Sequence, residues 1–234
     1  MCGRYRLSRK DRFAQYFEVD PFDDFEPRYN IAPTQSVTVV RQVDSARYLT
    51  TMRWGLVPSW SKDTSVSASL INARSEMVME KPAFRDSFRS RRCLIPANGF
   101  YEWKRSGKTK QPYHFGLNDD DLFAFAGLWD RWRSPGGKTI ESCSILTTTP
   151  NKLLSDIHDR MPVILPQRHY EAWLTAPASE GERFQEVLVP FEAERMRRYP
   201  VSSLVNAAQN ESAECAQQIE SVPDQASTGF LFDL

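Results

Sequence analysis

The second residue of the chain is a cysteine, which gains unusual chemistry once the initiator Met1 is removed. Cys2 then carries a free α-amine beside a free thiol. An α-amine has a pKa of about 7.7–8.0, against about 10.4 for lysine, so more of it is neutral and nucleophilic at pH 7. Such an amine forms a Schiff base with an aldehyde, and the adjacent thiol can close a five-membered thiazolidine ring. Cys2 is therefore a candidate nucleophile, and an incidental thiol near a chain end is the alternative.

Asn72 and Arg74 stand two residues apart, with Ser75 and Glu76 immediately after them. In an extended segment residues i and i+2 lie on the same face. A neutral amide and a guanidinium on one face could orient a sugar and bind its phosphate. The alternative is a strand end at which Asn72 caps a turn and Arg74 pairs with Glu76.

Two further residues are candidates for proton transfer. Glu102 lies between Tyr101 and Trp103 in a strand-like segment, where burial would raise its pKa and suit it to proton transfer. Alternation alone does not decide between that placement and an exposed face. His158 lies at an expected junction between a helix and an apolar run, and such a loop can present a catalytic imidazole, although a lone histidine is more often structural.

The elements that must position these residues are mostly strands. Strand patterns cover residues 37–41, 48–53, 93–95, 100–105, 113–117, 122–132 and 139–148, and helix patterns cover 9–17, 75–91, 151–157 and 167–174. Ser8 and Asp11 predict a capping box that opens the first helix. We find no internal repeat or low-complexity linker, which favours one domain over residues 1–222, with 223–234 as a loose tail. The expected fold class is α+β.

The composition indicates a folded globule without a strong overall charge. The 234 residues are 41% hydrophobic, 26% charged and 12% aromatic, and 30 Lys+Arg balance 30 Asp+Glu. Zero net charge argues against nucleic-acid binding by bulk charge. The charge is nevertheless segregated, because residues 1–12 and 85–110 are basic while 18–26 and the segment after 198 are acidic. Such charged stretches are either solvated faces or a sign that the basic ones bind an anionic ligand on one side of the protein.

Several classes of site are not indicated by the sequence. The four cysteines lack C-x-x-C spacing, and the three histidines form no H-x₃₋₅-H pair, so we expect no structural zinc and no cofactor. The N-terminal segment has no apolar signal region, and no run approaches the length of a membrane span. We therefore expect a cytoplasmic protein with reduced thiols and no membrane partner.

Taken together, four segments resemble the SOS response-associated peptidase (SRAP) family. They are Met1-Cys2-Gly3-Arg4, Asn72-Ala73-Arg74-Ser75-Glu76, Gly99-Phe100-Tyr101-Glu102-Trp103 and Ile157-His158-Asp159-Arg160-Met161-Pro162. The match continues through Tyr29-Asn30-Ile31-Ala32-Pro33, Trp54-Gly55-Leu56, Ile95-Pro96-Ala97, Thr147-Thr148, Pro200-Val201-Ser202 and Val205-Asn206. The resemblance thus spans nearly the whole chain in order.

The resemblance implies a single α+β domain, with mostly antiparallel strands in a barrel-like core, peripheral short helices and a basic groove. It also implies a sensor of abasic sites in single-stranded DNA that shields the lesion through a thiazolidine cross-link at Cys2. Autoproteolytic exposure of the cysteine and a possible DNA lyase activity are associated with the family. We expect a monomer that uses no cofactor or metal and that is nucleoid-associated if bacterial.

The family pattern also assigns residues. The implied catalytic set is Cys2, Asn72, Glu102 and His158, and the implied DNA contacts are Arg4, Arg74 and Arg160 on phosphates with Pro33 and Trp54 on bases. Arg85 is added as a phosphate contact from local charge alone. Two departures stand out: Pro150 replaces a common alanine, and residues 207–211 lack a basic residue often found there, which puts phosphate contacts at that end in question.

Two other functions fit parts of the sequence. Glutamine amidotransferases also begin Met-Cys-Gly and use the cysteine as an acyl acceptor, although their other motifs are not visible here. A noncovalent binder of single strands or modified bases would use the aromatic and basic residues and would not need Cys2.

Overall fold

The computed structural model describes residues 2–22 and 25–220. The expected loose tail, 223–234, lies outside the described residues and stays a prediction. No helix in the described part of the chain is long and apolar enough to cross a membrane.

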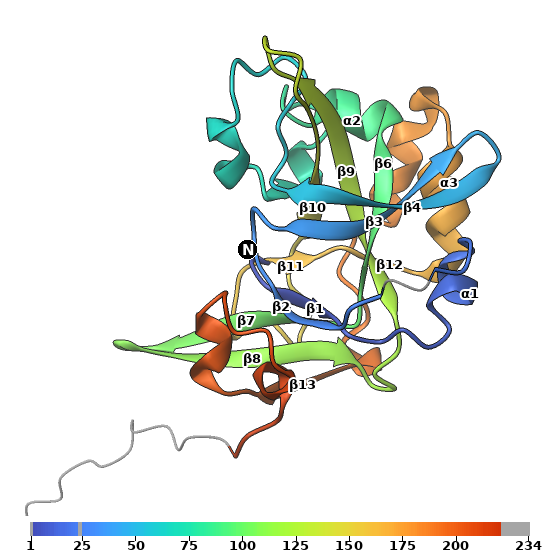
Figure 1. The fold of residues 1–234 in the computed structure, drawn as a ribbon. Helices are drawn as coiled ribbons and strands as arrows, with labels where there is room; N and C mark the ends of the chain where they lie inside the picture. The colour runs from blue at the N-terminus through green and yellow to red at the C-terminus, as the bar shows by residue number, and fades with distance from the viewer. Residues whose placement is uncertain (1, 23–24, 221–234) are drawn as a thin grey trace, which may run out of the picture.

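Strands dominate the structure, as the sequence predicts (Figure 1). The strands are β1 Tyr5–Leu7, β2 Arg28–Ile31, β3 Ser36–Val43, β4 Ala46–Trp54, β5 Asn72–Arg74, β6 Arg92–Ala97, β7 Gly99–Ser106, β8 Thr109–Leu117, β9 Phe123–Arg133, β10 Thr139–Thr148, β11 Met161–Pro162, β12 Ile164–Leu165 and β13 Met196–Pro200. The α-helices are α1 Phe13–Phe17, α2 Arg85–Ser90 and α3 Tyr170–Thr175. The 3₁₀ segments are Ser65–Ser69, Ser75–Met77, Gln167–His169, Ala178–Glu186, Ala193–Arg195, Ser203–Asn206 and Ala213–Ala216.

Five strands close into a barrel. The pairing runs β10–β4–β3–β6–β9, and β9 pairs again with β10. Only the β4–β10 pair is parallel, and the other four pairs are antiparallel. Closure removes the free edges that an open sheet would expose. The expected α+β fold with a barrel-like, mostly antiparallel core is therefore confirmed.

A second sheet, in the order β13–β8–β7–β1–β2, packs against the barrel. Aromatic contacts join the two parts: the ring of Phe125 on β9 lies 5.7 Å from Tyr5 on β1 and 6.1 Å from Phe100 on β7. One continuous apolar cluster therefore spans both sheets. This shared core makes the chain a single domain and fixes β7 and β1 relative to the barrel.

Two expected helices begin or end differently from the prediction. Helix α1 starts at Phe13 instead of residue 9, because Arg12 adopts the left-handed conformation at the N-cap and no side chain caps the helix. The capping box of Ser8 and Asp11 is thus wrong. The segment 75–91 splits into a 3₁₀ turn and α2, because Pro82 disfavours the helical conformation of the residue before it.

The expected helix over 151–157 is also wrong, since this segment is a series of turns. The Asn151 side-chain oxygen accepts hydrogen bonds from the backbone of Leu153 and Leu154, at 3.1 and 3.2 Å. An Asn side chain that binds nearby backbone N–H groups competes with helix formation. The turns end at His158, and its backbone N–H donates to the carbonyl of Leu154.

Candidate active site

Cys2 is held between the barrel and the second sheet. Asn72 begins β5, which pairs in parallel with β10, and its Nδ2 donates to the Cys2 carbonyl at 2.9 Å. On the other side, the backbone N–H of Tyr101 on β7 donates to the carbonyl of Arg4. The Asn72 Oδ1 atom is buried and has no hydrogen-bond partner among the described residues. It is available to accept a hydrogen bond from an amine at Cys2.

The thiol of Cys2 is fully buried. Burial, and secondarily the negative charge of Glu102, raises the pKa of the Cys2 thiol well above its usual value. The thiol therefore stays protonated at neutral pH, and it is not a pre-formed thiolate nucleophile. This arrangement favours a reaction in which the α-amine attacks first and the thiol adds in a later, intramolecular step.

Glu102 lies on β7 and is 3% exposed. Burial raises the pKa of this carboxyl to about 8. At pH 7 most of it is therefore protonated and can donate a proton, as in enzymes that use a neutral carboxylic acid as general acid.

His158 has the opposite shift, because partial burial lowers its pKa below the usual value. The imidazole is therefore mainly neutral at pH 7. Its Nδ1 lies 2.9 Å from a carboxylate oxygen of Asp159 and 3.0 Å from the backbone N of Arg160. Because Nδ1 accepts the backbone N–H of Arg160, the neutral imidazole carries its proton on Nε2, and Nδ1 is the basic nitrogen.

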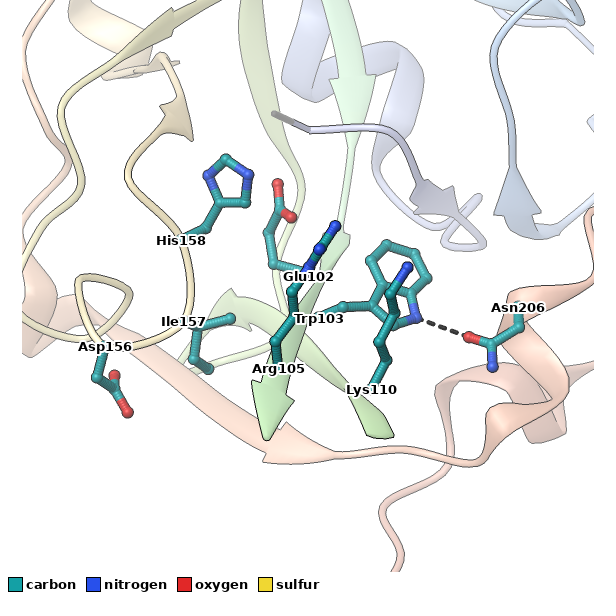
Figure 2. Close-up of a pocket in the computed structure, with 8 residues that line it drawn as sticks. All are labelled: Glu102, Trp103, Arg105, Lys110, Asp156, Ile157, His158 and Asn206. Atoms are coloured by element: carbon teal, nitrogen blue, oxygen red, sulfur yellow. Dashed lines mark hydrogen bonds between the residues drawn. The ribbon is translucent and has the colours of Figure 1, made fainter. Parts of the chain in front are cut away.

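Glu102 and His158 line one depression of about 620 Å³. Figure 2 shows both side chains directed into the same space, from β7 and from the turn before β11. A neutral carboxylic acid and a neutral imidazole in one site can act as a general acid and a general base at the same pH. The structure thus brings Cys2 and Asn72 together by a hydrogen bond, and it couples Cys2 electrostatically to Glu102.

Arg4 is partly buried and hydrogen-bonded within the protein. Its guanidinium donates to the Asn30 side chain and to the carbonyls of Val205 and Asn206, at 3.2–3.3 Å. Residues 202–216, here called the C-terminal strap, are held to the second sheet by these bonds. Arg4 therefore anchors the strap beside the depression, and its expected phosphate contact stays a prediction.

Arg160 is likewise engaged within the protein. The residue is 8% exposed, and its guanidinium donates to both carboxylate oxygens of Glu76 at 2.7 and 2.8 Å and to the Thr147 carbonyl. The bidentate pair links the turn after β5 to the loop before β11, and the Thr147 bond links that loop to the end of β10. Arg160 thus positions the loop that carries His158, and its expected phosphate contact stays a prediction.

Replacing Arg160 by alanine should therefore lower stability. Because Glu76 is half exposed and stays hydrated without its partner, we expect a loss of about 2 kcal/mol in the free energy of unfolding. Urea denaturation measures this loss. Arg85→Ala removes the same charge from an exposed site and should change stability by less than about 0.5 kcal/mol. Equal midpoints for the two variants would contradict the assignment.

Trp54 cannot stack on a base in this structure. The side chain is fully buried, its Nε1 donates to the Ile71 carbonyl at 2.9 Å, and its ring packs on Tyr5. The base contact expected of it is therefore corrected to a core role. Pro33 is half buried in the turn between β2 and β3, and a base contact there stays a prediction.

The loop after β4 carries a different tryptophan at its surface. Trp60 is 61% exposed, the highest value among the large exposed hydrophobic residues. Sequence reasoning missed it, although its position between Ser59 and Ser61 after Pro58 is typical of an exposed loop. An exposed indole in this loop is free to stack, in contrast to Trp54.

Arg74 and Arg85 are both exposed but lie in different places. Arg74 ends β5, two residues after Asn72, so its expected role as a phosphate contact near Cys2 stays a prediction. Arg85 lies on α2 and is paired with Asp86 at 3.5 Å. Figure 1 places α2 at the opposite end of the molecule from the β7–β8 hairpin, so Arg85 does not belong to this site.

The fold and the site together define a protein with a buried cysteine at its second position, hydrogen-bonded to an amide and close to a depression that holds a carboxylic acid and an imidazole. The chain matches the family "SOS response associated peptidase (SRAP)" over residues 1–208, and it belongs to that family.

Named relatives cover most of the chain. It is 44% identical over 219 residues to the abasic site processing protein YoqW of Bacillus subtilis, spanning 92% of this chain and 98% of the relative. It is 34% identical over 235 residues to the abasic site processing protein HMCES of Mus musculus, spanning 84% and 66% of the two chains.

Solved structures have the same fold. A protein from Bacteroides thetaiotaomicron superposes with a TM-score of 0.84 at 26% identity, covering 94% of this chain and all of that one. A protein from Bordetella bronchiseptica gives a TM-score of 0.74 at 31% identity, covering 86% of this chain and all of that one.

Proposed function

We propose that this protein processes abasic sites in single-stranded DNA, by forming a thiazolidine cross-link through Cys2 after removal of Met1. The observation that carries the proposal is the Asn72 hydrogen bond to Cys2, beside a depression that holds Glu102 and His158. The printed names of relatives that cover nearly the whole chain support abasic-site processing. The cross-link would shield the lesion.

The reaction begins with the aldehyde of the ring-opened deoxyribose. The α-amine of Cys2 attacks this carbon and forms a carbinolamine, and Asn72 Oδ1 accepts a hydrogen bond from the amine. Protonated Glu102 then donates its proton to the departing hydroxyl, which leaves as water, and the Glu102 carboxylate takes back the N–H proton of the resulting iminium to give a neutral imine. Before this attack, His158 takes the proton of the C1 hydroxyl of the closed sugar and returns it to the ring oxygen as the bond between C1 and the ring oxygen breaks. The thiol finally adds to the imine carbon, and its proton passes to the nitrogen, so one water is released overall.

The imine also explains why a lyase activity belongs to the proposal. A Schiff base at this carbon acidifies the neighbouring C–H bond, and β-elimination would then break the strand. The Cys2 thiol is on the residue that forms the imine, so ring closure benefits from a high effective concentration. Stable capture should therefore exceed cleavage. Hydrolysis of the Met1–Cys2 bond, by the same site, would account for the peptidase in the family's name.

The direct test incubates the purified protein with a single-stranded oligonucleotide that carries one abasic site, followed by a denaturing gel. A heat-resistant shifted band that requires the lesion supports the proposal, and an undamaged strand is the control. Mass spectrometry confirms that Met1 is absent. If no band forms with Met1 gone, the proposal fails, and glutaminase activity in the same preparation would identify the amidotransferase alternative.

Trp60 should contribute to noncovalent binding. Because stacking of a base on an aromatic ring is worth about 1–3 kcal/mol, Trp60→Ala should weaken affinity for single-stranded DNA by about 5- to 150-fold. Its exposure predicts little change in unfolding free energy. Fluorescence anisotropy measures the affinity. Tyr48→Ala removes another exposed aromatic side chain from the surface and serves as the control. Equal affinities for both variants would remove Trp60 from the interface.

A further inference from the structure

The depression that holds Glu102 and His158 continues along the β7–β8 hairpin. Its lining also includes Trp103, Arg105 and Lys110. Arg105 and Lys110 are direct partners across the antiparallel ladder, and side chains of such partners lie on the same face, with their Cβ atoms about 4.5–5.5 Å apart. Figure 2 shows both cationic side chains extending from the hairpin in the same general direction as Glu102.

The charges of Arg105 and Lys110 are not neutralised within the described chain. Among residues 2–22 and 25–220 neither side chain makes an ion pair, whereas the adjacent Lys104 pairs with Asp156 at 3.5 Å. Both are exposed. The positive charge of Arg105 also contributes to lowering the pKa of His158, after burial and other causes. Arg105 therefore lies within electrostatic reach of the site.

Trp103 supplies an apolar surface between the cations and the proposed reaction centre. Its Nε1 donates to the Asn206 side chain at 2.6 Å, so the C-terminal strap fixes the indole. Trp103 stays partly exposed in the depression, and Ile157 lines the same depression. A cationic pair beside a partly exposed indole is the combination that binds a nucleic-acid strand without reading its sequence.

We propose that the β7–β8 hairpin is a strand-binding arm, on which Arg105 and Lys110 hold phosphates of the DNA that continues from the lesion, while Trp103 contacts the neighbouring nucleotide. The inference rests on the proposed function, because it assumes that the lesion occupies the space between Cys2 and His158. The ligand of this arm is the single-stranded DNA on one flank of the lesion.

The test measures noncovalent binding, so that it does not depend on the cross-link. The probe is a single strand with one tetrahydrofuran residue, an abasic analogue that has no aldehyde. The variant is Arg105→Gln with Lys110→Gln. The matched control is Lys108→Gln, which removes a charge from the same hairpin but outside the lining of the depression. Affinity is measured over a range of salt concentrations, and circular dichroism checks the fold.

Each phosphate contact to a single strand contributes about 0.7 to the slope of log affinity against log salt. The double variant should lose about 1.4 from this slope, and Lys108→Gln should keep the wild-type slope. Shortening the probe on one flank should weaken wild-type binding while leaving the double variant unaffected. A wild-type slope in the double variant, or an equal loss in Lys108→Gln, overturns the inference. Failure of the cross-link with a true abasic strand, while these slopes differ, would instead refute the proposed function alone.

Discussion

Replacing Cys2 by alanine is expected to abolish the heat-resistant complex with abasic DNA completely. The variant keeps its α-amine, so it can still form a transient imine, but it has no thiol to close the ring. An imine hydrolyses on denaturation, whereas a thiazolidine ring persists. Noncovalent binding should remain, because Cys2 is buried and does not contribute a charge to the surface. A gel with the abasic strand and anisotropy with the tetrahydrofuran strand separate the two effects.

Two companion variants sharpen this result. With Cys2→Ala, borohydride reduction should convert the imine into a stable amine and recover a shifted band, which shows that the amine attacks first. Cys215→Ala removes another buried thiol, located in the C-terminal strap, and should cross-link like the parent. A covalent band in unreduced Cys2→Ala would contradict the role of the thiol, and loss of noncovalent binding along with the band would indicate a folding defect.

The fold class could be predicted from sequence because strand patterns are local. The predicted strands over 122–132 and 139–148 fall on β9 and β10, since their β-branched and aromatic residues favour the extended backbone. Barrel closure was implied only by the family resemblance. It depends on the pairing of β9 with both β6 and β10, between segments distant in the chain. Residue patterns within one segment carry no information about such partners.

The roles of the arginines show where sequence reasoning stops. Arg4 and Arg160 look like phosphate contacts because cations near a proposed DNA site usually bind phosphates. In the structure both are engaged by partners far along the chain: Arg4 by Val205 and Asn206, and Arg160 by Glu76. The pairing partner of a charged residue is set by tertiary structure, which the local pattern does not encode.

Tertiary structure also determines which of two nearby tryptophans is exposed. Trp54 and Trp60 are six residues apart, and both belong to a strand-to-loop segment that the sequence marks only as a break. Trp54 still lies on β4 and faces Tyr5, whereas Trp60 lies beyond the strand and is exposed. Because the last strand residue cannot be located precisely from its pattern, the sequence alone could not tell which indole reaches solvent.

The acid–base pair gives the second large prediction. Adduct formation should follow a bell-shaped pH profile. Below the lowered pKa of His158 the imidazole is protonated and cannot accept a proton, so the rate rises as pH increases through that pKa. Above about pH 8 Glu102 is ionised and cannot donate a proton, so the rate falls. Deprotonation of the α-amine can only raise the rate with pH, so a fall above pH 8 reports on Glu102.

Glu102→Gln should therefore slow adduct formation by about 10²–10⁴-fold and remove the decline above pH 8, because glutamine has the shape of the protonated acid but donates no proton. Single-turnover rates, measured from pH 5.5 to 9.5 with excess protein, test both expectations. Glu194→Gln, on the exposed turn before β13, is the matched control and should keep the parental profile. Retention of the decline in Glu102→Gln would assign it to another group, and parental rates would remove Glu102 from the chemistry.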